Sequence, residues 1–159
     1  KIKALLAIIS TEVPMLVDIT KLATLTGIAR TTMLAYLQYL HEAKLIRLLY
    51  SDDLSVKKMQ KPDKILMENT NLLQALSLQV PNIGTMRETF FCNQLGYTHQ
   101  VEYNKRGDYL IDHKYVFEIG GKAKDGKQVA NMENAYIASD ECDYPIGNKL
   151  PLWLFGLMY

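Results

Sequence analysis

The chain has 159 residues, of which 48% are hydrophobic and 22% are charged, and its formal net charge is +1. This length allows one ordinary domain or two small ones, and the composition is that of a soluble globular protein. The longest apolar run, "LPLWLFGLMY", is too short to cross a bilayer, so we expect no membrane partner.

The cysteines and the first residues indicate a cytoplasmic protein. Cys92 and Cys142 lie far apart in no metal-ligand spacing, which suggests a reducing compartment. The stretch "ALLAII" belongs to an amphipathic helical pattern, and no small-residue cleavage site follows it, so it is not a signal peptide. Because the sequence begins inside this pattern without a Met, we expect it to be a piece of a longer protein.

Charge is distributed unevenly along the chain. Residues 1–64 hold ten Lys or Arg against six acids, and the remaining residues hold eight against eleven. A basic front and an acidic back favour a polyanion-binding module joined to a different one.

Three helical patterns occupy the first fifty residues. The first ends near Ser10, and the second begins at Asp18, a good N-cap, and ends at Gly27, a good C-cap. The third begins near Ala29 and runs past Leu40. A strand at 45–50, a turn at 51–55 and a returning strand at 56–60 follow. This order predicts a winged helix-turn-helix over residues 1–66.

Residues 67–159 predict a second, mixed α/β domain in the order α-β-β-β-α-β. It is preceded by an apolar, strand-like segment at 64–69 and a short helix at 70–80. The six predicted elements are a helix at 85–96, strands at 97–103, 108–112 and 115–120, a helix at 124–133 and a strand at 135–140.

Three carboxylates in this domain favour metal-dependent phosphodiester chemistry. Asp108 and Glu118 are ten residues apart across one predicted hairpin, so they can sit side by side and hold Mg²⁺ or Mn²⁺. Glu88 lies on the preceding helix and would assist. A nearby lysine, for which we select Lys122, would stabilise developing charge.

The helix with Glu88 and the strands with Asp108 and Glu118 resemble the PD-(D/E)XK nuclease fold, a restriction-endonuclease-like domain. The resemblance implies that these three residues are its carboxylates and that Gln128 lies on the following helix. The family's lysine stands two residues after the glutamate, but position 120 here is Gly, and Lys122 and Lys124 follow. On an extended strand, positions 118, 120, 122 and 124 share a face, so a displaced lysine could reach back.

The whole chain also resembles the C-terminal region of a group of prokaryotic AAA-type ATPases. The resemblance lies in the winged-helix pattern followed in order by "KPDKILMENTNLLQAL", "TMRETFFCNQL", "GDYLID…FEIGGK" and "GNKLPLWLFGLMY". It implies a partner, the protein's own N-terminal ATPase domain. ATP would bind only there, because no G-x-x-x-x-G-K-[ST] loop occurs in this chain.

Each candidate site residue also has a structural explanation. Thr85 and Glu88 fit a helix capping box, and Asp108 follows Gly107 and fits a turn. Strand alternation is also compatible with Glu118 on a solvated face, and lysines are surface residues by default.

The first domain carries candidate DNA contacts at the start of its third helix and around its wing. They are Arg30, Thr31, Thr32, Lys57, Lys58, Lys61 and Lys64. Acids at Glu42, Asp52 and Asp53 favour the opposite interpretation, in which the domain docks a protein.

The sequence thus predicts the nucleic-acid-binding, effector-side region of an AAA-type ATPase with a nuclease-like domain. The alternative is a non-catalytic regulatory or protein-interaction module of that ATPase.

Overall fold

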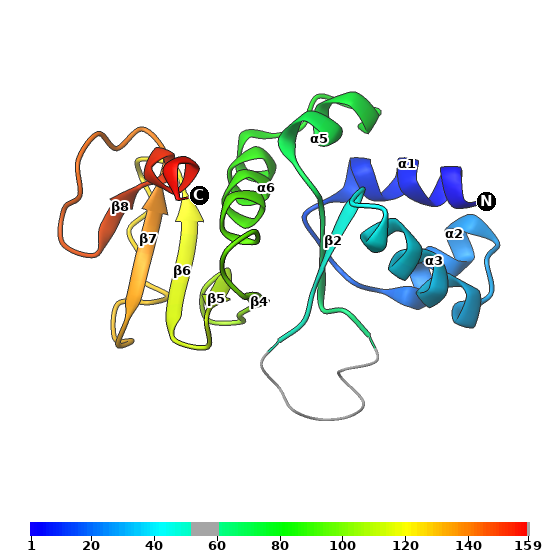
Figure 1. Cartoon of the computed structure of the whole chain (residues 1–159), viewed down its shortest axis with the longest axis horizontal. Coiled ribbons are helices and arrows are strands. Elements are labelled where there is room, and N and C mark those ends of the chain that lie inside the picture. The colour runs from blue at the N-terminus through cyan, green and yellow to red at the C-terminus, as the bar shows by residue number, and fades with distance from the viewer. Residues whose placement is uncertain (52–60, 159) are drawn as a thin grey trace.

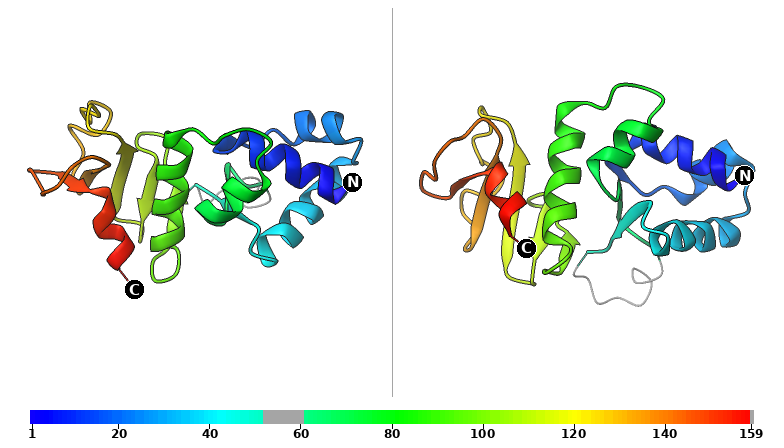
Figure 2. Two further views of the ribbon diagram at one scale, coloured as in Figure 1. Left: turned by 90° about the horizontal axis from the view of Figure 1, so that it is seen from above. Right: turned by 45° about the horizontal axis from the view of Figure 1, so that its top comes forward.

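The computed structural model describes residues 1–51 and 61–158, and within them the chain has a mixed α/β fold. These residues form six helices, a three-stranded antiparallel sheet and a five-stranded mixed sheet, so the predicted mixed α/β class is confirmed. Helix α6 (Ile83–Leu95) stands between the two sheets in the views of Figures 1 and 2. No helix in the described ranges is long and apolar enough to span a membrane.

The first half of the chain forms three helices and the smaller sheet. Its elements are α1 (Ile2–Glu12), β1 (Met15–Leu16), α2 (Ile19–Thr26), α3 (Arg30–Glu42), β2 (Ile46–Leu49) and β3 (Lys64–Met67). The predicted caps of α2 are confirmed: Asp18 accepts hydrogen bonds from the N–H groups of Thr20 and Lys21, and Gly27 has a φ of 62°. The strand predicted at 56–60 and the turn before it, apart from Ser51, lie outside the described residues.

Strands β2 and β3 of the smaller sheet are buried on both faces. The strand order of this sheet is β1-β3-β2, and all pairs are antiparallel. Ile46 and Ile65 pack with α1, α2 and α3 in the first core, whereas Leu49 and Leu66 pack in a second core with the five-stranded sheet. Because side chains alternate along a strand, β2 and β3 contribute to both cores at once.

The second half contains α5 and α6, the larger sheet and a closing 3-10 helix. After α5 (Thr70–Leu76) and α6 come β4 (Val101–Tyr103), β5 (Tyr109–Ile111), β6 (Tyr115–Gly120), β7 (Ala135–Ser139), β8 (Lys149–Pro151) and η1 (Leu152–Leu157). The strands lie in chain order; β4, β5 and β6 are antiparallel, and β7 and β8 run parallel to β6. The strands predicted at 97–103, 108–112, 115–120 and 135–140 are therefore confirmed, with shifted ends.

The helix predicted at 124–133 is wrong, so the order α-β-β-β-α-β lacks its second helix. These residues form successive turns, in which Val129 N–H donates to Gly126 O and Met132 N–H donates to Val129 O. Gly126 has a φ of 66°, which the right-handed helix excludes. The turns still bury Val129 against Val116 and Ile137, on one face of the sheet.

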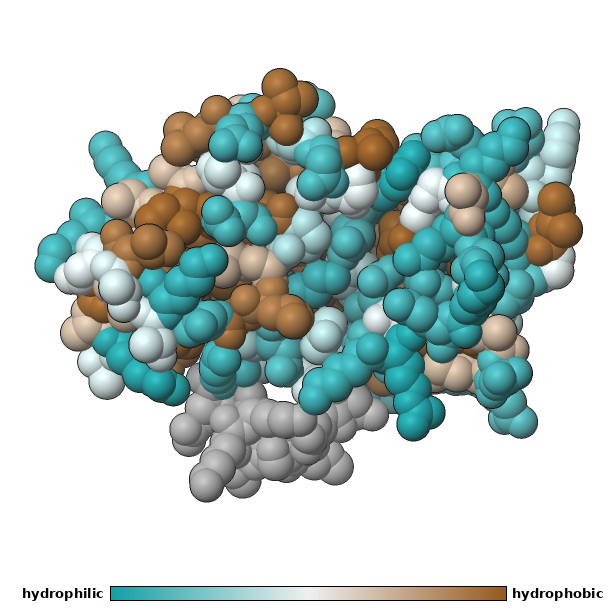
Figure 3. Space-filling model, turned by 180° about the vertical axis from the view of Figure 1, so that it is seen from behind, coloured by the Kyte–Doolittle hydropathy of each residue, from teal (hydrophilic) through white to brown (hydrophobic). Residues whose placement is uncertain are grey.

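The other face of the larger sheet carries the aromatic core. Phe91 of α6 packs against Phe117 of β6 and Phe155 of η1, with ring centroids 5.1 and 4.8 Å away. Figure 3 shows that, on the face seen from behind, hydrophobic residues lie mainly over the half that contains α1, α2 and α3. The half that contains the larger sheet is mostly hydrophilic on that face.

Candidate functional site

Asp108 comes directly before β5, and Glu118 lies in β6, the other strand of the same hairpin. The ladder between the strands ends at the pair Tyr109 and Phe117, and Asp108 N–H donates to Phe117 O at 2.8 Å, one residue out of that register. The Oδ2 of Asp108 accepts a 2.6 Å hydrogen bond from the N–H of Ile119, the residue after Glu118. The structure therefore places both predicted metal ligands at the same end of the hairpin.

Glu118 is a buried carboxylate, and only 2% of its surface is exposed. The alternative of a solvated side chain is therefore wrong. Its Oε1 lies 2.9 Å from Lys124 Nζ. Its Oε2 is buried and has no hydrogen-bond partner in the described part of the chain. An unsatisfied buried carboxylate oxygen is costly, and a bound cation would satisfy it.

Lys124, rather than Lys122, reaches the carboxylates. Strand β6 ends at Gly120, so the extended backbone expected through position 124 is not formed, and the side chain of Lys122 is exposed. The side chain of Lys124 crosses Gly120, where an added Cβ would lie 2.8 Å from Lys124 Cγ. Gly120 thus leaves room for the side chain of the lysine four residues later.

The environment shifts the pKa of two of these groups. Burial raises the pKa of Asp108, although a 2.6 Å hydrogen bond from the N–H of Ile119 opposes the shift. Burial alone would lower the pKa of Lys124, but the hydrogen bond to Glu118 and the charges of nearby acids raise it above its ordinary value. Lys124 therefore stays protonated and neutralises part of the buried negative charge.

Glu88 takes part in a separate network. Its Oε2 accepts hydrogen bonds from Lys64 Nζ and from the hydroxyl of Tyr109, both at 2.5 Å. Tyr109 and Phe117 belong to the aromatic core, so alternation places Glu118 on the opposite face of β6. No group of three His, Cys, Asp or Glu within the described ranges is arranged to hold a metal ion, although the charge of Glu88 still acts on Asp108.

The capping-box explanation of Glu88 is wrong. Asn82 is the N-cap of α6, and its side chain accepts a hydrogen bond from the N–H of Thr85 at 2.8 Å. Thr85 is buried, and its hydroxyl donates to Val13 O at 3.2 Å. Glu88 is therefore one turn further into the helix than the N3 position that a capping box requires.

The prediction that Lys64 neutralises a DNA phosphate is wrong, because Lys64 is buried and paired with Glu88, and sequence reasoning also missed the role of Tyr109. Lys64 is only 8% exposed, and its ammonium lies 4.6 Å from the centroid of the Tyr109 ring. The signal in the sequence is a lysine at the start of a strand whose other residues are all apolar. Such a lysine, buried on both sides, needs an acidic partner.

Apart from Lys64, the predicted DNA contacts that the structure describes are exposed. Arg30, Thr31 and Thr32 form the first turn of α3, and Lys61 precedes β3. Lys57 and Lys58 lie outside the described residues. Gln128 is exposed and lies among turns, because the helix predicted there is not formed.

Comparison with known proteins assigns no function to the chain, so the geometry described above is the basis for inferring one. No protein-family model, curated protein or solved structure matches the chain.

Proposed function

We propose that the chain is the nucleic-acid-binding, effector-side region of an AAA-type ATPase, and that its second half cleaves nucleic acid with a divalent metal ion. In this proposal residues 1–66 are a winged helix-turn-helix and residues 67–159 a PD-(D/E)XK nuclease-like domain. The order of α1, β1, α2, α3, β2 and β3, with a β1-β3-β2 antiparallel sheet, supports the first assignment. Helix α6 before three antiparallel strands, with β7 parallel to the third, supports the second.

The observation that carries the catalytic part is the buried Oε2 of Glu118, which has no partner among the described residues. Asp108 accepts a hydrogen bond from the N–H of Ile119, the residue after Glu118, and the two carboxylates would together offer the hard oxygen ligands that Mg²⁺ or Mn²⁺ prefers. Mg²⁺ is commonly held by one or two carboxylates, with water and substrate phosphate in its remaining positions. Two carboxylates therefore suffice, and Glu88 is not required as a third ligand.

Each residue then has a distinct role. Asp108 and Glu118 would hold the ion, which would activate water and polarise the scissile phosphate. Lys124, 2.9 Å from Glu118, would stabilise charge on the phosphate, the role that the sequence assigned to Lys122. Glu88 would tune the site through its charge rather than by contact with the ion. Arg30, with its exposed position at the start of α3, would bind the phosphate backbone.

The first experiment is cleavage of single- and double-stranded DNA with Mg²⁺ or Mn²⁺ by the chain and its Glu118→Gln variant. We expect metal-dependent cleavage that the variant loses by at least about a hundredfold, because a metal ligand is removed while side-chain volume is kept. Glu133→Gln, at an exposed acid, is the matched control and should cut normally. Equal cutting by all three proteins would rule out the assigned site.

DNA binding by the first half is tested separately. In fluorescence anisotropy, Arg30→Ala with Lys61→Ala should weaken duplex binding and reduce the slope of log K against log salt by about 1.8, since each lost phosphate contact removes about 0.9. Lys105→Ala with Lys114→Ala removes the same charge from the other half, where both lysines are exposed, and should leave the slope unchanged. An unchanged slope in the first variant would contradict DNA binding through α3.

One observation favours the alternative, a non-catalytic regulatory or protein-interaction module. Lys124 already neutralises part of the charge of Glu118 without any metal ion. Under this alternative the pair is a structural ion pair. The chain would then show no metal-dependent cleavage and no change in melting temperature with Mn²⁺.

A further inference from the structure

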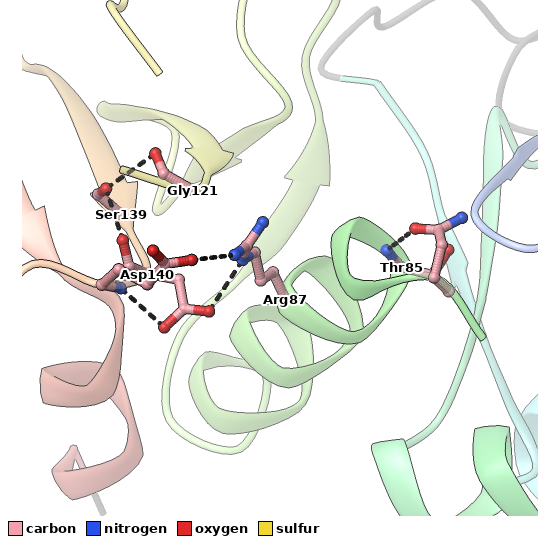
Figure 4. Close-up of polar contacts among 7 residues, drawn as sticks. Thr85, Arg87, Gly121, Ser139 and Asp140 are labelled. Atoms are coloured by element: carbon pink, nitrogen blue, oxygen red, sulfur yellow. Dashed lines mark hydrogen bonds and ion pairs between the residues drawn. The ribbon is translucent and has the colours of Figure 1, made fainter. Parts of the chain in front are cut away.

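The segment that carries Lys124 is fixed by hydrogen bonds from the end of β7. Gly120 O accepts from the N–H of Asp140 at 2.8 Å, and Gly121 O accepts from the hydroxyl of Ser139 at 3.1 Å. Figure 4 shows Ser139 and Asp140 beside Gly121. Ser139 is fully buried, and its hydroxyl shares its one hydrogen between Gly121 O and Asp140 O, which also lies 3.1 Å away. The carbonyl groups of Gly120 and Gly121 are therefore held in place.

Arg87 closes the same turn from α6. Its Nε and Nη2 form ion pairs with Asp140 at 3.0 Å and Glu141 at 3.3 Å (Figure 4). An added Cβ at Gly121 would lie 3.0 Å from Arg87 Nη1, so the guanidinium stands against the backbone of the turn. The turn is thus enclosed by α6 on one side and by β7 on the other.

Lys149 binds two further carbonyl groups of the segment, those of Lys122 and Lys124. Its ammonium donates to Lys122 O at 2.6 Å and approaches Lys124 O at 3.4 Å. The backbone of Lys149 is itself fixed, because β8 pairs with β7 and because Lys149 and Ile146 exchange two backbone hydrogen bonds. A lysine ammonium has three donors, so it can serve both carbonyl oxygens at once.

We propose that Lys149 is a positioning residue that fixes the 120–124 segment so that the Lys124 ammonium is held at Glu118. This inference rests on the proposed function for its catalytic consequence. The contact itself is seen in the geometry. The Lys149 ammonium donates to the two carbonyl groups that flank Ala123. The Lys124 side chain then passes back over Gly120 to the buried carboxylate of Glu118. Without the Lys149 ammonium, these carbonyl groups would form hydrogen bonds with water instead, and the Lys124 ammonium would be away from Glu118 for part of the time.

The direct test measures how fast Lys124 is acylated by a small amine-reactive ester, site by site, by mass spectrometry on the full chain. In the unaltered protein we expect Lys124 to react much more slowly than the exposed Lys105, because it is held in an ion pair. In Lys149→Met the rate at Lys124 should rise toward that of Lys105. In Lys149→Arg, which can also donate to two carbonyl groups, the rate should stay near its original value.

Two further variants separate positioning from general loosening. Ser139→Ala removes a different hydrogen bond to the same segment and should also raise the rate at Lys124. Lys114→Met removes a lysine of the same sheet that does not contact the segment and should leave the rate unchanged. An unchanged rate in Lys149→Met, or an equal rise in Lys114→Met, would overturn the proposal.

The catalytic consequence is measured in the DNA cleavage assay with Mn²⁺. Lys149→Met should lower the single-turnover rate about tenfold or more, since a displacement of about 1 Å in a catalytic group costs up to a hundredfold. Lys149→Arg should restore most of the rate. If the unaltered chain does not cut DNA, the proposed function fails, whereas the acylation rates still decide whether Lys149 positions Lys124.

Discussion

At the scale of single residues, Gly120 determines what Lys124 can reach. The side chain of Lys124 passes over the α-carbon of Gly120, with Cγ, Cβ and Cδ all within 2.9 Å of the place where a Cβ would stand. Gly120 has no positive φ, so its backbone conformation is open to any residue. The glycine is therefore required for space rather than for conformational freedom.

Gly120→Ala should displace Lys124 from Glu118 and lower the rate of metal-dependent cleavage by about ten- to a hundredfold, as removal of a charge-stabilising group does. The free energy of unfolding should change by no more than about 1 kcal/mol, because the displaced side chain is partly exposed. A double-mutant cycle with Lys124→Ala is the control. In the Lys124→Ala background, Gly120→Ala should have no further effect on the rate, and additive losses would contradict the shared mechanism.

Asp108 gives a pH dependence whose sign follows from its raised pKa. A carboxyl group with a higher pKa in the folded state than in the unfolded state binds protons more tightly when folded, so its contribution to stability falls as pH rises above 3.8. Asp108→Asn should therefore make the metal-free protein more stable at pH 7, by an amount of the order of 1 kcal/mol. This gain should shrink toward pH 4 in urea titrations, and a gain independent of pH would contradict the raised pKa.

The sequence predicted the residues of the hairpin better than their surroundings. Asp108 and Glu118 could be assigned to the two sides of one hairpin because only a short turn separates them, but no local pattern predicted that the register shifts by one residue at Asp108. The choice of Lys122 over Lys124 failed because it assumed extended strand through Gly120 and Gly121. The packing of Lys64 against Glu88 joins residues 24 positions apart, and no local pattern predicts which buried lysine meets which acid.

At the scale of elements, α6 shows how the two sheets are joined. Its N-terminus is capped by Asn82, and its C-cap residue Gly96 lies under the guanidinium of Arg47 from β2. Arg47 also forms a buried ion pair with Glu68, with 2.6 Å between Nη2 and Oε1. A cation at the C-terminus of a helix interacts favourably with its carbonyl groups, so Arg47 joins β2 to α6.

Gly96→Ala should destabilise this junction, because the new Cβ would lie 1.5 Å from Arg47 Nη1 and must push the buried guanidinium aside. We expect a loss of about 1–3 kcal/mol in the free energy of unfolding, the usual cost of overpacking. Gly84→Ala at the other end of α6 is the control. Its Cβ would meet only Asn82 Oδ1, at 3.2 Å, so its effect should stay within about 1 kcal/mol. Similar losses in both variants would contradict the role of Arg47.

The sequence predicted helices well where caps and apolar periodicity agree, as in α2. It failed at 124–133 because "KQVANME" has good helix formers, while the space beside the sheet decides its conformation. An added Cβ at Gly126 would lie 2.3 Å from Ile137 Cδ1, so the backbone near the start of this segment packs directly against a side chain of β7. Tertiary packing of this kind overrides helix propensity.

At the scale of the whole molecule, β2 and β3 unite the two halves. Tyr103 N–H donates to Tyr50 O at 2.9 Å, and Ser51 forms a parallel bridge to Tyr103, so the two sheets touch through their backbones. Leu49 and Leu66 add apolar contacts to the second core from the smaller sheet. The division at residue 66 falls within β3 and stays a prediction.

We expect the chain to unfold in one cooperative transition. The fluorescence of the single tryptophan, Trp153 in η1, reports on the second half. The far-UV circular dichroism signal comes in large part from helices α1, α2 and α3 and therefore reports on the first half. Both signals should share one midpoint in urea, which is the usual test of two-state behaviour.

The Leu66→Ala variant extends this test, because Leu66 is fully buried between the halves. It should lower the stability by about 2–5 kcal/mol, and both midpoints should shift together. A midpoint that moves for Trp153 alone would show that the halves unfold independently.

The path of Lys124 over Gly120 also affects how related chains are recognised from sequence. A search that demands lysine two residues after the strand glutamate rejects this chain at position 120. The pattern Glu-x-Gly-x-x-x-Lys accepts it, and the glycine in this pattern is informative, because it leaves the space through which a lysine six residues after the glutamate reaches back to it. Chains set aside as having lost their lysine should therefore be re-read for this spacing.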